Sequence, residues 1–106
     1  MSDEINVAHI LIMHQDSEQS SSARTREEAM EEIEALKKNI AGGADFSELA
    51  AENSDCPSAA DGGNLGTFGR GAMVPEFDEA AFKLDVGQVS DVVETDFGYH
   101  LIYRIA

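Results

Sequence analysis

Three side chains carry useful chemistry: His9 and His100, which lie in apolar segments, and Cys56, the only cysteine. A thiol with an imidazole as its base suggests a thiol hydrolase, and the same three residues suggest a zinc site. The sequence favours neither, because no third orienting residue or oxyanion hole is evident, the intervals are long, and no paired-ligand motif such as C-x-x-C occurs. A histidine on an apolar strand is most often a buried structural residue, so that interpretation also stays open.

The stretch from Asn53 to Phe77 is the most unusual part of the chain. It contains the only cysteine, both prolines and five of the nine glycines. Four apolar side chains are spaced between them: Leu65, Phe68, Met73 and Phe77. So much glycine is unfavourable in a packed element, and the regular apolar residues are unusual in a linker. We therefore expect a loop, a short strand and a second loop that present a shallow apolar cleft, with an ordinary core as the alternative.

The elements that position these residues can be predicted from periodicity. Residues 5–13 are apolar on both side-chain parities, which predicts a strand covered on both faces. Thr25 followed by Glu28 is typical of a capping box, and the helix after it should end at Gly42 and Gly43. Its apolar face is Ala29, Ile33, Leu36 and Ile40. Asp45 and Glu48 repeat the capping pattern for a shorter helix that reaches about Asn53.

The second half of the chain predicts one helix and three strands. The GNLGTFG segment, residues 63–69, could form a short strand weakened by glycine. Pro75 fits the first turn of a helix that ends by Gly87. Residues 88–95 indicate a strand, 96–98 a turn, and 99–106 a further apolar strand. The order β-α-α-β-α-β-β is typical of an α+β fold with helices on a small mixed or antiparallel sheet.

Composition excludes several classes of protein. A length of 106 residues with 42% hydrophobic content predicts one domain, residues 1–106. The formal net charge of −14 disfavours binding to nucleic acid or to an anionic membrane. No apolar stretch approaches the roughly 20 residues of a transmembrane helix, and the start MSDEINV is acidic where a signal peptide is basic. We therefore expect a complete, soluble, cytoplasmic monomer with Cys56 as a free thiol.

Several blocks of the chain, in one order, resemble the parvulin-type peptidyl-prolyl isomerases. They are VAHILI, GGADFSELAAENSD, GGNLGTFGRGAMVPEFDEAAFKL, GQVSDVV and TDFGYHLIYRI, which together cover nearly the whole sequence. The resemblance implies a four-stranded antiparallel sheet surrounded by helices, with the first and last strands adjacent at its centre. It also implies catalysis of rotation about Xaa-Pro bonds in proline-containing peptides or unfolded proteins, with no cofactor and no metal.

The resemblance also assigns roles to individual residues. His9 and His100 match the paired histidines of the family, and Thr95 matches the hydroxyl residue beside them. Cys56 lies where members carry cysteine or aspartate. The proline pocket is matched by Leu65, Met73 and Phe77, with Phe68 as an aromatic at its border. We expect the polar residues to act by orientation and electric field rather than by proton transfer.

One departure from the family concerns the first loop. The phosphate-specific member carries a basic cluster there, whereas residues 15–22 here are neutral to acidic. A requirement for phosphoserine before proline is therefore not expected, and the acidic chain predicts that basic residues near the proline favour turnover. The alternative from another class is a non-catalytic, peptide-binding chaperone module with the same fold.

Overall fold

The computed structural model describes residues 4–16 and 24–106. Four antiparallel strands form one sheet: β1 (Glu4–Ile12), β2 (Asn64–Gly69), β3 (Val93–Thr95) and β4 (Gly98–Arg104). Their order is β2-β1-β4-β3, so the first and last strands are adjacent at the centre, as the family resemblance implies. Both central strands are almost entirely buried, which confirms the prediction from the apolar run at the start of the chain.

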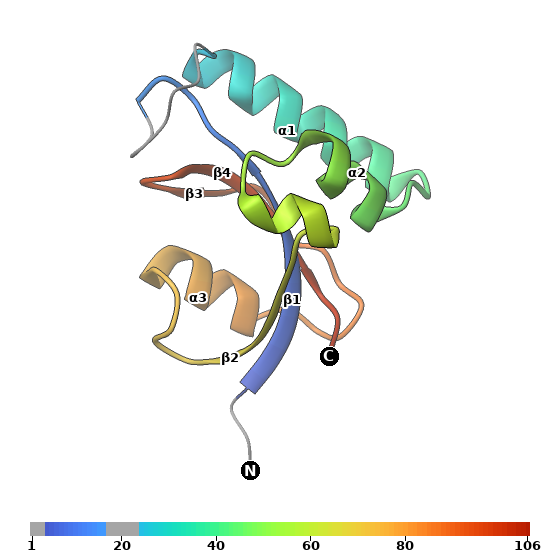
Figure 1. The fold of residues 1–106 in the computed structure, drawn as a ribbon, viewed down its shortest axis with the longest axis vertical. Coiled ribbons are helices and arrows are strands. Elements are labelled where there is room, and N and C mark those ends of the chain that lie inside the picture. Colours follow the sequence, from blue (N-terminus) through green and yellow to red (C-terminus); the bar gives the residue numbers. More distant parts are fainter. Residues whose placement is uncertain (1–3, 17–23) are drawn as a thin grey trace.

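Helices cover both faces of the sheet (Figure 1). The helices α1 (Arg26–Ala41) and α2 (Phe46–Asn53) pack on one face, against alternate β1 residues such as Ala8, Ile10 and Ile12. The helix α3 (Pro75–Phe82) packs on the other face, against Val7 and Ile102. Because successive strand residues point to opposite faces, His9 and Leu11 lie on the same face as Val7, beneath α3.

The predicted helix ends are largely confirmed. Thr25 accepts a hydrogen bond from the Glu28 N–H and the Glu28 side chain accepts one from the Thr25 N–H, so the capping box of α1 is complete. Asp45 caps α2 by accepting from the Ser47 N–H. Pro75 is in the first turn of α3, where its missing N–H leaves no helical hydrogen bond unmade. These helix starts fix where the preceding loops end.

Three details differ from the sequence-based prediction. A short 3₁₀ helix, η1 (Pro57–Asp61), lies within the segment predicted as a loop. The helix α3 ends at Phe82, before Gly87. Of the strand predicted over residues 88–95, only Val93–Thr95 forms a strand, preceded by an isolated bridge between Val89 and Tyr103.

Ser90 explains the short third strand. Its hydroxyl donates to the carbonyl of Asp91 and accepts the N–H of Ile102, while its own N–H donates to the Ile102 carbonyl. A side chain therefore replaces a backbone group in the ladder with β4, and the regular strand begins only after it. Over the described ranges, no helix has both the length and the apolar character needed to cross a membrane.

Candidate functional site

A cavity of about 350 Å³ opens on the face of the sheet that α3 covers. Six of the residues singled out from the sequence line it: His9, Cys56, Leu65, Met73, Phe77 and His100. They come from β1, the loop before η1, β2, the loop before α3, α3 itself and β4. The chain thus brings together residues that are up to 91 positions apart, and the cleft predicted for the glycine-rich stretch exists with two histidines at its base.

The two histidines are joined directly. His9 pairs with Ile102 and Leu11 pairs with His100, so the histidines are diagonal neighbours on one face of the two central strands. Their Nδ1 atoms are 3.1 Å apart, whereas their ring centroids are 5.3 Å apart and the ring planes differ by 20°. The nitrogens therefore lie between the ring centres, and the rings meet edge to edge, nearly coplanar, through one hydrogen bond.

Thr95 extends this pair into a chain of hydrogen bonds. Its hydroxyl oxygen is 2.7 Å from Nε2 of His100 and accepts the N–H of Phe97 at 3.2 Å. If Thr95 donates to His100, the His100 proton is on Nδ1 and is donated to Nδ1 of His9. The opposite direction leaves the Thr95 proton without an acceptor among the hydrogen bonds of the described residues. The first arrangement is therefore favoured, and it puts the proton of His9 on Nε2.

Burial keeps both histidines neutral. His9 is 5% exposed and His100 is 4% exposed. Loss of hydration lowers the pKa of His9 to about 4. Loss of hydration, followed by repulsion from His9, lowers the pKa of His100 to about 3. Within the part of the chain that the structure describes, Nε2 of His9 is buried with no hydrogen-bond partner, which makes it the unsatisfied polar group of the site.

Phe77 covers the histidine pair on the side of α3. Its ring centroid lies 5.5 Å from that of His9 and 5.4 Å from that of His100, and its plane is nearly perpendicular to both. The ring is 3% exposed. Phe77 therefore has two roles in the site. It forms part of the cavity wall, and it excludes water from the hydrogen bond between the histidines.

Cys56 borders the cavity without joining this network. It is a half-buried free thiol immediately before η1, and within the described ranges it makes no hydrogen bond to either histidine. The geometry of a thiolate with its base, which a thiol hydrolase needs, is therefore not formed. Across residues 4–16 and 24–106, no three His, Cys, Asp or Glu side chains converge as metal ligands would.

Two of the predicted site residues lie outside the cavity lining. Thr95 is buried and acts on the site through His100. Phe68, expected at the border of the pocket, does not line it, because its β2 position puts the ring in the core behind Phe77, 6.4 Å away between centroids, and against Phe82. Phe68 therefore supports the cavity wall from behind, and its expected role at the border of the proline pocket stays a prediction.

The sequence prediction missed five residues of the lining: Leu11, Met13, Asp55, Val74 and Phe97. Two of them carried a usable signal. Leu11 follows His9 by two positions and so points to the same face of a strand. Asp55 precedes Cys56 directly. The lining role of Phe97 depends on the geometry of the turn between β3 and β4, which local sequence does not specify.

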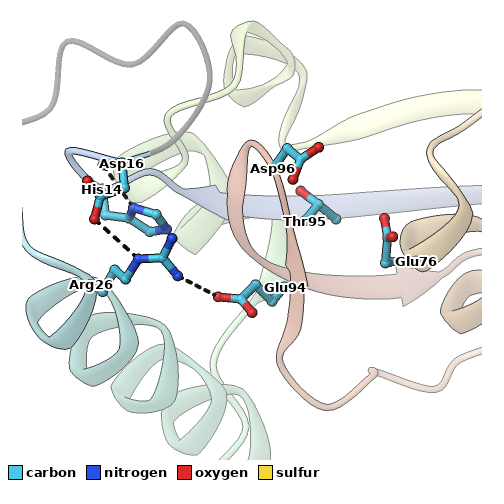
Figure 2. Close-up of a pocket in the computed structure, with 7 residues that line it drawn as sticks. All are labelled: His14, Asp16, Arg26, Glu76, Glu94, Thr95 and Asp96. Carbon is cyan, nitrogen blue, oxygen red and sulfur yellow. Dashed lines mark hydrogen bonds and ion pairs between the residues drawn. The ribbon is translucent and has the colours of Figure 1, made fainter.

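A second cavity, of about 550 Å³, is polar (Figure 2). It is lined by His14, Asp16, Arg26, Glu76, Glu94, Thr95 and Asp96. Arg26 lies between two carboxylates and donates to Asp16 and Glu94 at 3.2 Å each. We assign the functional site to the smaller cavity, since the reactive groups converge there and its wall is apolar.

Comparison with known proteins gives one consistent result. Residues 9–106 match the family described as Rotamase, PPIC-type PPIASE domain. The chain is 44% identical to "Peptidyl-prolyl cis-trans isomerase Pin1" of Arabidopsis thaliana over 115 residues, which covers 98% of this chain and 97% of that protein. It is 43% identical to the Pin1 protein of Digitalis lanata, with 97% of each chain covered.

Solved structures show the same relationship. The peptidyl-prolyl isomerase ESS1 from Candida albicans matches with a TM-score of 0.92 at 38% identity, over 98% of this chain and 63% of that one. The solution structure of TbPIN1 matches with a TM-score of 0.90 at 36% identity, over the full length of both chains. The similarity therefore includes the sheet, the helices and the connections that position the cavity.

Proposed function

The chain belongs to the PpiC-type family of peptidyl-prolyl cis-trans isomerases, the parvulins, and on that premise we propose that its apolar cavity holds the proline ring of the substrate. The isomerase activity follows from the family. The proposal concerns how this chain performs it and on which substrates. The observation that carries it is the position of Leu65, Met73 and Phe77 around a cavity whose base is the histidine pair.

The reaction requires no covalent chemistry. Resonance gives the amide a rotational barrier of about 18–20 kcal/mol, and a catalyst must stabilise the twisted amide more than either planar form. The apolar wall removes the proline ring from water and anchors it, while the carbonyl before it loses solvent hydrogen bonds that oppose its rotation. The neutral, preorganised chain from Thr95 through His100 to His9 supplies a fixed field at the twisted bond.

We propose further that phosphate before proline is not required. Among the described residues that line the cavity there is no lysine or arginine, and the lining includes the carboxylate of Asp55. The cation that contacts the rim, Arg24, is already paired with Asp55 at 2.8 Å and with Glu32 at 2.9 Å. Residues 17–23, which lie outside the described part, contain no lysine or arginine in their sequence. If Arg24 were to bind a doubly charged phosphate group, it would therefore have to break its ion pairs with Asp55 and Glu32.

The substrates supported by these features are unmodified Xaa-Pro segments of unfolded or flexible protein chains, with turnover that assists folding. The test is exchange NMR on a short Ala-Pro peptide with and without a catalytic amount of the protein. Faster cis-trans exchange is expected. Peptide binding at the cavity with no acceleration would instead identify a binding module, and a phosphoserine-proline peptide turned over far better than its unmodified counterpart would contradict the substrate proposal.

A further inference from the structure

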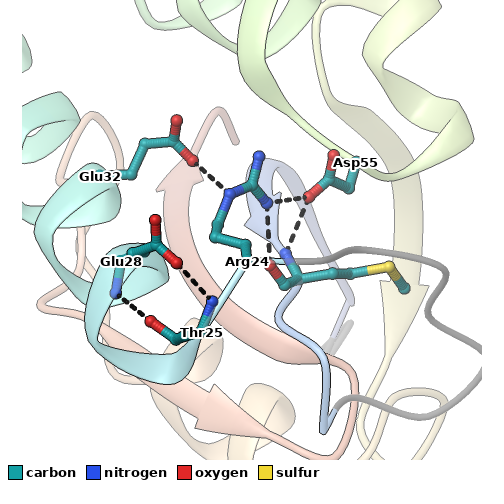
Figure 3. Close-up of polar contacts among 6 residues, drawn as sticks. Arg24, Thr25, Glu28, Glu32 and Asp55 are labelled. Atoms are coloured by element: carbon teal, nitrogen blue, oxygen red, sulfur yellow. Dashed lines mark hydrogen bonds and ion pairs between the residues drawn. The ribbon is translucent and has the colours of Figure 1, made fainter.

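Arg24 connects three separate parts of the chain (Figure 3). Its Nη1 donates to the carbonyl of Met13 and to Oδ2 of Asp55, both at 2.8 Å, and its Nε forms an ion pair with Glu32 at 2.9 Å. These partners lie just after β1, in the loop between α2 and η1, and on α1. A planar guanidinium presents N–H donors from separate nitrogens in fixed directions, whereas lysine ends in one ammonium that rotates on a flexible stem.

The contact with Met13 and Asp55 is a closed arrangement. Oδ2 of Asp55 accepts the N–H of Met13 at 2.9 Å as well as the guanidinium of Arg24, and the carbonyl of Met13 accepts from the same guanidinium nitrogen. Both backbone polar groups of Met13 are therefore satisfied by one ion pair. The geometry of the ion pair fixes the end of β1 relative to the loop that carries Cys56.

This ion pair lies at the rim of the isomerase cavity. Met13 and Asp55 both line it, and so do Leu11 and Cys56 on either side of the contact. Behind the rim, the N–H of Asp55 donates to the Leu11 carbonyl at 2.7 Å, and the hydroxyl of Ser54 accepts the N–H of Leu11 at 3.0 Å. The loop is thus attached to β1 over several residues, and Arg24 provides the last attachment at the opening.

Arg24 also sets the charge of the rim. Asp55 is the one carboxylate among the described residues of the cavity lining, and its charge is compensated by the guanidinium. The chain as a whole is strongly acidic, with 21 acidic against 7 basic residues. Without Arg24 the cavity would present an uncompensated negative charge to every substrate that enters.

From this geometry we propose that Arg24 is a positioning and specificity-determining residue of the isomerase, although it does not line the cavity. It holds Met13 and Asp55 in place and compensates the charge of Asp55, so that the rim itself does not repel peptides with an acidic residue before proline. This inference rests on the proposed binding of the substrate in the apolar cavity.

The experiment measures kcat/KM for Lys-Pro, Ala-Pro and Glu-Pro peptides with the wild type and with five variants. These are Arg24→Gln, Arg24→Lys, Asp55→Asn, the double variant Arg24→Gln with Asp55→Asn, and the control Glu32→Gln. A unit charge about 6 Å from another in water changes an equilibrium constant roughly threefold. In Arg24→Gln, the exposed charge of Asp55 should raise kcat/KM for the Lys-Pro peptide and lower it for the Glu-Pro peptide. The ratio of Lys-Pro to Glu-Pro turnover should therefore rise about tenfold. The change should appear mainly in KM, and 0.5 M NaCl should reduce it.

The other variants separate charge from position. The double variant should return the ratio to near its wild-type value, because Asp55 no longer carries a charge. Arg24→Lys should keep the ratio, while KM for the neutral Ala-Pro peptide rises, because an ammonium on a flexible stem holds Met13 and Asp55 less rigidly than a planar guanidinium does. Glu32→Gln is the matched control: it removes the ion pair with α1 and leaves the rim contacts intact, so it should change neither quantity.

Three outcomes would overturn the inference. One is an unchanged Lys-Pro to Glu-Pro ratio in a folded Arg24→Gln protein. Another is an equal loss of kcat/KM on all three peptides in Arg24→Gln, with no recovery when Asp55→Asn is added. That result would make Arg24 a purely structural residue. The third is the same effect from Glu32→Gln. Absence of turnover by the wild type on every peptide would contradict the proposed function. Failure of the proposed function can thus be told apart from failure of the inference about Arg24.

Discussion

At the scale of single residues, the site depends on two histidines that the fold keeps uncharged. Unfolded histidine titrates near pH 6.5, whereas burial lowers the pKa to about 4 in His9 and about 3 in His100. Between these values the unfolded chain binds more protons than the folded one. The stability associated with the neutral pair is therefore fully present above about pH 6.5 and is lost as the pH falls toward 4 and 3.

The variant His9→Asn tests this linkage. Asparagine keeps a polar atom near the position of Nδ1 but cannot titrate. The variant should be less stable than the wild type at pH 7, and the difference should shrink by about 2 kcal/mol between pH 7 and pH 4.5, at about 1.4 kcal/mol per pKa unit. Urea unfolding at both pH values measures it. Parallel stability profiles for the two proteins would show that His9 does not titrate as its burial predicts.

Cys56 poses a different question at this scale, namely whether the thiol reacts. Rotation about an amide breaks no covalent bond, and the thiol makes no hydrogen bond to either histidine in the described structure. Cys56→Ser should therefore retain isomerase activity to within a few-fold, as measured by exchange NMR on an Ala-Pro peptide. A loss of about a hundredfold or more, with an unchanged fold, would require an obligatory covalent role.

At the scale of elements, the site depends on how closely the segment between η1 and β2 approaches β1. Gly63 lies at φ 84° with its N–H bonded to the Ser58 carbonyl, and its own carbonyl accepts the N–H of His9 at 2.9 Å. A Cβ at Gly63 would lie 2.3 Å from the backbone oxygen of His9. No real contact is that short, so a side chain at position 63 must displace either β1, which carries His9, or the segment between η1 and β2.

Gly63→Ala should for this reason cost stability and activity together. Its matched control is Gly71→Ala, which has a similar φ of 86° but no heavy atom within 4 Å of the added Cβ. The positive φ costs roughly 1–2 kcal/mol in both variants. Gly63→Ala should lose at least about 2 kcal/mol more in urea unfolding, because it adds a backbone clash. Equal losses would show that the clash relaxes without cost.

Most elements were predictable because each has a local signal. The capping box at Thr25 and Glu28, the proline at position 75 and the unbroken apolar run of β1 depend on neighbouring residues only. The prediction failed where distant contacts decide. Residues 88–92 have strand composition, but the Ser90 hydroxyl takes the place of a backbone group opposite Ile102.

For the site, the family resemblance supplied what spacing could not. Nothing local joins His9 to His100, since their contact depends on β1 and β4 being neighbours in the sheet. The rim residues Met13 and Asp55 were missed for the same reason. Met13 has ordinary sequence surroundings, and the one signal for Asp55 is its place beside Cys56. Arg24 contacts both residues, although they are 42 positions apart.

At the scale of the whole molecule, the main feature is the net charge of −14 on a chain with a radius of gyration of 12.9 Å. At 0.01 M ionic strength the screening length is about 30 Å, so the surplus carboxylates repel one another across the entire protein. Compact folding brings these charges closer than they are in the unfolded chain. The repulsion therefore destabilises the folded state and is the part of its energetics most sensitive to salt.

Raising NaCl from 0.01 to 0.5 M at pH 7 should consequently raise the melting temperature, by roughly 5 °C for each 1 kcal/mol of repulsion removed. Screening also weakens the surface ion pairs, such as those of Arg26 with Asp16 and Glu94, but exposed pairs contribute little, so the net effect should remain stabilising. Circular dichroism melts provide the measurement. The control is the same series near the sequence pI of 4.2, where the net charge vanishes and the dependence should flatten. A melting temperature that falls with salt at pH 7 would mean that the ion pairs outweigh the net charge, and that the acidic surface imposes no cost on this fold.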